Sequence, residues 1–168
     1  YKVRDNFHTI LLCKNAYGVL ELNKVMGASY DADHKYYKPR ITFEEFFGLS
    51  DNIIKISACL ASPLRKYTSE CDGFRQEVYD KLCETYDYYE IQPHDFPEQK
   101  RYNEFLYAAS KQMGKPLIAG TDTHSIDYYK AECRSILQKA KRIEYADEDK
   151  FDLTLKTYEE LVEMFRIQ

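Results

Sequence analysis

Short apolar runs alternate with longer stretches of helical periodicity along this chain. Four runs are rich in apolar and β-branched residues and have the length of strands, and they cover residues 7–13, 53–57, 88–92 and 116–119. Between and after them, apolar residues recur at every third or fourth position, which indicates amphipathic helices. The helical segments comprise residues 19–26, 42–47, 73–86, 97–113, 133–140 and 157–165.

Capping residues mark the ends of several of these helices. Asn15 precedes the first helix as a suitable N-cap, and the segments 42–45 and 157–160 both read Thr-x-x-Glu, the pattern of a capping box. Gly114 and Pro116 follow the fourth helix, where a glycine and a later proline commonly end a helix. These signals depend only on the local sequence, and they set the expected ends of the helices.

The repeated order of strand and then helix predicts the fold class. Parallel strands need crossover connections, which are usually helices, so this order indicates an α/β protein with mainly parallel strands and outer helices. The acidic stretch from Glu144 to Asp152 predicts an exposed connection. At 168 residues the chain suits a single domain with its own core.

Composition restricts the class of protein. A hydrophobic content of 44% with 31% charged residues is typical of soluble globular proteins, and no apolar run approaches the roughly 20 residues of a membrane span. The five cysteines are odd in number and contain no CxxC pair, which favours reduced thiols in a cytoplasmic protein. The chain begins without Met and leads almost at once into a strand, so we expect a piece of a longer protein.

Charge and motifs exclude several functions. A net charge of −4 argues against a strongly basic nucleic-acid module, although a local basic patch remains compatible with it. The segment 35–40 is basic and aromatic and is suited to phosphate contacts, but a solvated loop is the commoner explanation of such a cluster. The sequence contains no Walker A loop, GxGxxG, GxSxG or HExxH motif.

The most informative candidate site follows the strand 116–119. Asp122 and His124 lie just past its C-terminal end, where ligands and metals bind in α/β folds. Carboxylate and neutral imidazole are good ligands for Zn, Mn and Fe. A turn carboxylate and a surface histidine would explain the same two residues equally well.

Three further residues could contribute to a site. His8 lies within the first predicted strand, where a core histidine is the favoured interpretation, and Cys59 follows the strand 53–57, where a small buried side chain is its commonest role. His94 lies in a loop stiffened by prolines. Because Asp95 beside it can simply cap the next helix, a structural role is favoured for this loop.

Five phrases of the sequence, taken together and in order, resemble the PHP (polymerase and histidinol phosphatase) domain of bacterial DNA polymerase III alpha subunits. The first resembles a strand in which a metal-binding His precedes an "LLAKN"-like segment. The others resemble a "YKPRI" loop, an "S-G/A-C-L" turn, an "EIQxH…PEQ" phrase and an "NDxH" segment. In the same order, the five phrases are Phe7–Asn15, Tyr37–Ile41, Ser57–Leu60, Glu90–His94 with Pro97–Gln99, and Gly120–His124.

The resemblance implies a partial, distorted (β/α)7 barrel of the PHP type with a metal cluster at the strand ends. Residues 1–145 would form the C-terminal part of this domain, and 146–168 an acidic connection and a helix leading toward the polymerase region. The implied metal ligands are His8, Cys59, Asp122 and His124, and the implied metal is Zn or Mn. His94 matches a family phrase without an assigned role. The family's opening His-x-His pair and other ligands would lie upstream of residue 1.

The resemblance also implies a role within a replicative polymerase. The parent protein would carry out DNA-directed DNA synthesis, and an intact site would hydrolyse a phosphoester or pyrophosphate bond with metal-activated water. Alternatively the domain would be a scaffold that docks the proofreading exonuclease. Implied partners are the polymerase domains of the same chain, that exonuclease and, through the parent protein, DNA, with no membrane.

An incomplete ligand set would leave this piece inactive by itself. A free-standing PHP phosphatase, similar to those acting on histidinol phosphate, is the alternative. The "YKPRI" and "EIQxH" phrases favour the polymerase branch.

Overall fold

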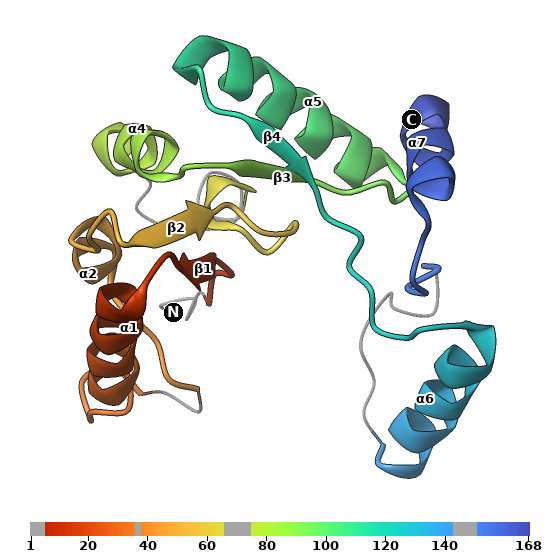
Figure 1. The fold of residues 1–168 in the computed structure, drawn as a ribbon, viewed down its shortest axis with the longest axis horizontal. Coiled ribbons are helices and arrows are strands. Elements are labelled where there is room, and N and C mark those ends of the chain that lie inside the picture. The colour runs from red at the N-terminus through yellow and green to blue at the C-terminus, as the bar shows by residue number, and fades with distance from the viewer. Residues whose placement is uncertain (1–5, 36–37, 66–74, 143–150) are drawn as a thin grey trace. The chain divides into compact units, whose positions relative to one another are not determined.

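The computed structural model describes residues 6–35, 38–65, 75–142 and 151–168. Each predicted strand and each predicted helical segment overlaps an element of the expected type (Figure 1). The strands are β1 (Ile10–Cys13), β2 (Ile53–Ile56), β3 (Tyr89–Ile91) and β4 (Leu117–Ala119). The helices are α1 (Ala16–Ala28), α2 (Phe43–Phe47), α4 (Gln76–Thr85), α5 (Pro97–Met113), α6 (Tyr128–Ala140) and α7 (Tyr158–Ile167).

The chain forms two compact units. Unit 1 comprises Tyr1–Glu90 and Phe105–Ile118, and unit 2 comprises Ile91–Glu104 and Ala119–Gln168. The division therefore passes through β3, α5 and β4. The boundary expected at residues 145 and 146 lies outside the described residues.

Two small sheets contain the strands. Their orders are β1–β2 and β3–β4, and the described residues form no closed barrel. Tyr89 pairs with Pro116 at one end of the second sheet and Ile91 with Gly120 at the other, so β3 and β4 run parallel. A parallel bridge between Ile56 and Tyr88 also places β3 beside β2.

The first sheet is the exception to the mainly parallel pairing expected from the sequence. β1 and β2 are antiparallel, with Ile10 opposite Ile56 and Cys13 opposite Ile53. The connection over residues 14–52 is long enough to return to either end of β1. The order of strand and helix therefore does not determine the direction of this pairing.

The core of unit 1 contains buried residues of β2, α2 and α4 and of the segments beside them. Tyr86 and Tyr89 are fully buried, and the Tyr86 ring contacts the Phe46 ring of α2 with centroids 5.3 Å apart. The Tyr86 hydroxyl shares a hydrogen bond of 2.5 Å with the Thr9 hydroxyl, and the Tyr89 hydroxyl donates to the Cys83 carbonyl. Burial raises the pKa of both tyrosines. The aliphatic part of this core consists of Ile53, Leu64, Leu82 and Leu106.

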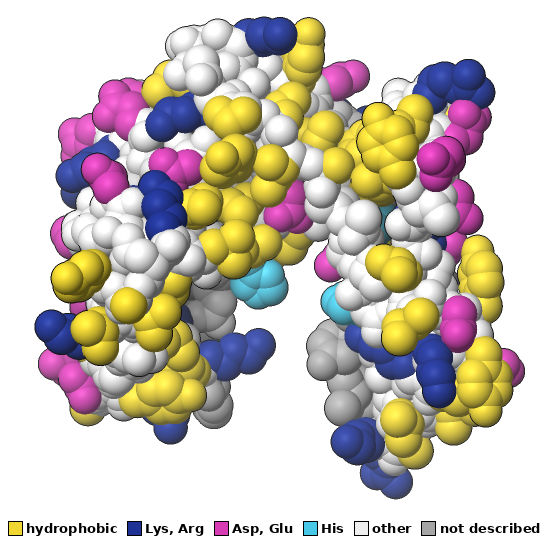
Figure 2. Space-filling model, viewed as in Figure 1, with side chains coloured by type: hydrophobic (Ala, Val, Ile, Leu, Met, Phe, Trp, Pro, Cys, Tyr) yellow, Lys and Arg dark blue, Asp and Glu magenta, His cyan; other side chains and the backbone are white. Residues whose placement is uncertain are grey.

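Among the described residues unit 2 buries fewer side chains than unit 1, and α6 and α7 contain no buried residue. Figure 2 shows hydrophobic side chains at the surface of α6 beside Lys and Arg side chains. The Gln168 amide nitrogen donates to the carbonyls of Gln92 and His94, and its oxygen accepts from Asn103. The end of α7 is thus attached to the segment that follows β3.

The capping predictions are confirmed. The Asn15 side chain accepts from the Gly18 amide, and both capping boxes, at Thr42 and at Thr157, form completely. Gly114 follows α5 with φ of 65°, the left-handed conformation that favours glycine at this position.

None of the helices among the described residues combines the length and the apolar character needed to cross a membrane.

The start of α1 lies directly against the turn before β2. The Lys14 amide donates to the Asn52 carbonyl, and the Asn15 and Asn52 side chains are hydrogen-bonded. A Cβ atom at Gly18 would lie 2.5 Å from that carbonyl oxygen, whereas a Cβ at Gly27, in the same helix, would meet nothing within 4 Å. Only glycine therefore fits at the first of these positions.

Gly18→Ala should destabilise the protein by about 1–3 kcal/mol, because the added methyl group must displace the Asn52 backbone. Gly27→Ala is the matched control and should stabilise it by about 0.5–1 kcal/mol, because alanine is the better helix former. Urea unfolding followed by circular dichroism measures both changes. Equal effects of the two substitutions would show that Gly18 is not packed against residue 52.

Candidate functional site

His8 and Cys59 form one pair of candidate residues in unit 1. The Cys59 Sγ lies 3.7 Å from the His8 Nδ1, and the His8 amide donates to the Ala61 carbonyl over 2.9 Å. His8 precedes β1 and is exposed, so its interpretation as a core histidine is wrong. Cys59 is half-buried and contacts an imidazole, which differs from the small buried side chain expected there.

A sharp turn at the end of β2 places Cys59 beside His8. Ala58 has φ of 61°, a left-handed conformation that is uncommon for a residue with a side chain. The hydroxyl of Ser57, which is fully buried, accepts a hydrogen bond of 2.9 Å from the Glu90 amide. This bond ties the beginning of the turn to β3, and the turn keeps a strained conformation of the kind common at functional sites.

Asp122, His94 and His124 form a second group, in unit 2. The His94 Nε2 lies 3.8 Å from the Asp122 Oδ2, and the His124 Nε2 lies 3.7 Å from the Asp122 Oδ1. Asp122 has φ of 49°, which aspartate tolerates better than most residues. The carboxylate thus has an imidazole near each oxygen, at distances longer than hydrogen bonds.

His94 is the buried member of this group, with 6% of its side chain exposed. Its ring contacts the ring of Phe151, with centroids 5.0 Å apart. Its Nε2 makes no hydrogen bond with the described residues, and the Asp122 Oδ2 lies 3.8 Å from it. The sequence favours a structural role for this loop, and the signals that mark His94 there are the flanking prolines and its place in a phrase that resembles the PHP family.

The charge of Asp122 is stabilised by this arrangement. The pKa of its carboxyl lies below the usual range, chiefly because of the His94 imidazole beside it. Partial burial acts in the opposite direction, and positive charge on His124 adds to the lowering. Asp122 is therefore ionised at neutral pH, which is the form that binds a metal ion.

The four predicted ligands divide equally between the units. His8 and Cys59 belong to unit 1, and Asp122 and His124 belong to unit 2. Among the residues that the structure describes, no group of three or more His, Cys, Asp or Glu side chains is arranged to hold a metal ion. Within unit 1 the structure brings His8 and Cys59 together, and within unit 2 it brings Asp122 and His124 together with His94.

Comparison with known proteins relates most of this chain to DNA polymerase III alpha subunits. It is 29% identical to that of Borreliella burgdorferi over 95% of the chain, and 30% identical to those of Deinococcus radiodurans and Aquifex aeolicus over 86% and 82%. The chain spans only 15%, 11% and 12% of these relatives. No family model matches the chain.

Asp122→Asn should reveal the interaction with His94 through its pH dependence. Because the pKa of Asp122 is lower in the folded protein, the ionised carboxylate stabilises the fold at neutral pH, by less than about 1 kcal/mol since Asp122 itself is 38% exposed. This contribution is lost as the pH falls below about 4 and through the lowered pKa. Urea unfolding at pH 7 and pH 3, with EDTA present, measures it.

Asparagine also tolerates the left-handed conformation, so the substitution adds no backbone strain. In a His94→Gln background the effect of Asp122→Asn at pH 7 should shrink, as expected for two interacting residues. An effect of the same size at both pH values, or in both backgrounds, would contradict the assignment.

Proposed function

We propose that this chain is part of the PHP domain of a bacterial replicative DNA polymerase. One observation carries this proposal: similarity to polymerase alpha subunits extends over 82–95% of the chain in three relatives. A PolC-type DNA polymerase III of Clostridium perfringens is also 29% identical, over 71% of the chain. These relatives support the polymerase over the alternative of a free-standing phosphatase.

In this proposal His8, Cys59, Asp122 and His124 are metal ligands. Imidazole, thiolate and carboxylate are all donors that Zn accepts, and Mn also binds imidazole and carboxylate. The contacts of His8 with Cys59 and of His124 with Asp122 support the assignment, because in each pair two donors already lie close together. When bound, such a metal would lower the pKa of its water and neutralise charge on a phosphate.

His94 would support this set without being a ligand. Its imidazole is held by the Phe151 ring and faces the Asp122 Oδ2, while the other carboxylate oxygen faces His124. Partners of this kind orient metal ligands and keep them ionised. The buried imidazole would thereby keep Asp122 in place.

Hydrolysis by this chain alone would require more ligands than these four residues provide. Enzymes that cleave phosphodiesters with two metal ions need ligands for each ion, and four donors complete one tetrahedral site at most. We therefore assign the segment a scaffold role within the polymerase, next to its polymerase domains and the proofreading exonuclease. DNA would be bound through the parent protein.

The chain of 168 residues should not hydrolyse 3′-labelled DNA with Mn²⁺ or Zn²⁺. Gel analysis of the labelled products measures the rate of hydrolysis. The unsubstituted chain and the Asp122→Ala variant, which defines the background rate, should give equal rates. Metal-dependent hydrolysis that Asp122→Ala abolishes would overturn the scaffold assignment. Asp95→Ala is the control, because this aspartate is exposed and forms an ion pair with Lys100.

The ligand assignment is tested by metal content in the complete polymerase that contains this segment. We expect bound Zn or Mn, and a lower content in the Cys59→Ala variant because one donor is lost. Cys13→Ala is the matched control, since Cys13 is an exposed cysteine at the end of β1. Elemental analysis of the purified proteins measures the amount of metal bound to each variant. Equal metal content in both variants would contradict the role of Cys59.

A further inference from the structure

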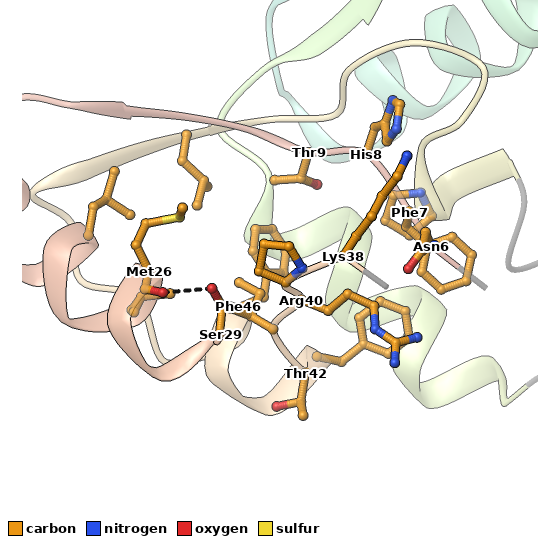
Figure 3. Close-up of a pocket in the computed structure, with 17 residues that line it drawn as sticks. Asn6, Phe7, His8, Thr9, Met26, Ser29, Lys38, Arg40, Thr42 and Phe46 are labelled. Atoms are coloured by element: carbon orange, nitrogen blue, oxygen red, sulfur yellow. Dashed lines mark hydrogen bonds between the residues drawn. The ribbon is translucent and has the colours of Figure 1, made fainter. Parts of the chain in front are cut away.

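A pocket of about 490 Å³ lies in unit 1 (Figure 3). Its apolar side is formed by α1 and α2, through Leu22, Val25, Met26 and Phe46. This volume lies within the range of small-molecule sites in proteins. The pocket is large enough for a compact organic ligand rather than a simple ion.

Two aromatic rings extend the apolar wall. Phe7, before β1, and Phe43, at the start of α2, both line the pocket, and their rings are stacked with centroids 5.6 Å apart. Aromatic walls of this kind pack well against planar rings, including the bases of nucleotides. The wall therefore favours a ligand with a flat, weakly polar part.

The polar rim of the pocket is basic. His8, Lys38 and Arg40 line it, and none of its described lining residues is acidic, although the chain has 28 acidic residues and 24 Lys and Arg. Figure 3 shows the Lys38 side chain extending toward His8. The rim thus selects a negatively charged group.

Arg40 and Lys38, the two strongly basic residues of the rim, differ in their hydrogen bonds. The Arg40 Nε donates to the His34 carbonyl over 3.3 Å, which fixes the guanidinium in place. No described residue forms a hydrogen bond or ion pair with the Lys38 ammonium, so its charge is available to a ligand. Lysine and arginine are the usual partners of phosphate oxygens.

We propose that this pocket binds a nucleoside monophosphate. Its phosphate contacts Lys38 and Arg40, and its base packs against the apolar wall that Phe7 and Phe43 extend. The combination of a basic rim with an aromatic wall fits a phosphate joined to a base better than it fits either part alone. The site shares His8 with the proposed metal ligands but uses neither Cys59 nor Asp122, and its phosphate contacts with Lys38 and Arg40 need no metal ion.

Isothermal titration of the 168-residue chain with deoxyadenosine monophosphate tests this proposal. EDTA is present, so that failure of the metal assignment cannot affect the result. The nucleotide should bind, whereas inorganic phosphate and deoxyadenosine should each bind at least about tenfold more weakly, since each lacks half of the contacts.

Lys38→Ala should weaken nucleotide binding by roughly tenfold or more, because a charge-assisted contact to phosphate is lost. Lys35→Ala is the matched control. Lys35 lies in the same loop region but does not line the pocket, and its ammonium lies 5.6 Å from the Tyr30 ring centroid. This control should bind the nucleotide within about twofold of the unsubstituted chain.

A second pair of variants tests the apolar wall. Met26→Glu places a negative charge in the pocket and should abolish nucleotide binding, and Leu20→Glu places the same charge on α1 outside it and should not. Both side chains are more than half exposed, so both variants should fold, which thermal unfolding verifies. Binding unchanged by Lys38→Ala, phosphate bound as tightly as the nucleotide, or no binding at millimolar nucleotide would each overturn the proposal.

Discussion

Unit 1 depends on the burial of β2 between two neighbours. β2 pairs with β1 on one side and meets β3 at the bridge between Ile56 and Tyr88 on the other. Even Lys55 of this strand is buried, where its ammonium donates to the Ser50 carbonyl and its amide donates to the Asp87 carboxylate. Because β2 is fixed on both sides, the turn that follows it has a defined position. That turn brings Cys59 to His8.

The two candidate groups keep features that cost stability. Ala58 and Asp122 both have left-handed backbone conformations, and the buried His94 has an Nε2 without a hydrogen bond to the described residues. Strain of this kind and an unsatisfied polar atom each cost on the order of 1–3 kcal/mol. Such features persist where the surroundings impose them, and they gather at functional sites. Their occurrence at the turn before Cys59 and at Asp122 itself agrees with the proposed ligand role.

His8 links the two proposals for unit 1. Its Nδ1 faces Cys59, and its side chain also lines the pocket that contains Lys38 and Arg40. A phosphate group held at the basic rim would therefore lie near a candidate metal ligand. The pairing of positive side chains with metal-binding donors is common wherever phosphate chemistry takes place. In a scaffold the same arrangement can bind a nucleotide without cleaving it.

The sequence by itself determined the elements and their ends, because helix caps and periodicity depend on neighbouring residues. Asn15, the two Thr-x-x-Glu boxes and Gly114 act as expected for this reason. Four candidate site residues were also marked in the sequence, through phrases that resemble a known family. The antiparallel pairing of β1 with β2, the exposure of His8 and the burial of His94 against Phe151 were decided by the tertiary structure. Each depends on contacts between residues far apart in the chain, which no local pattern specifies.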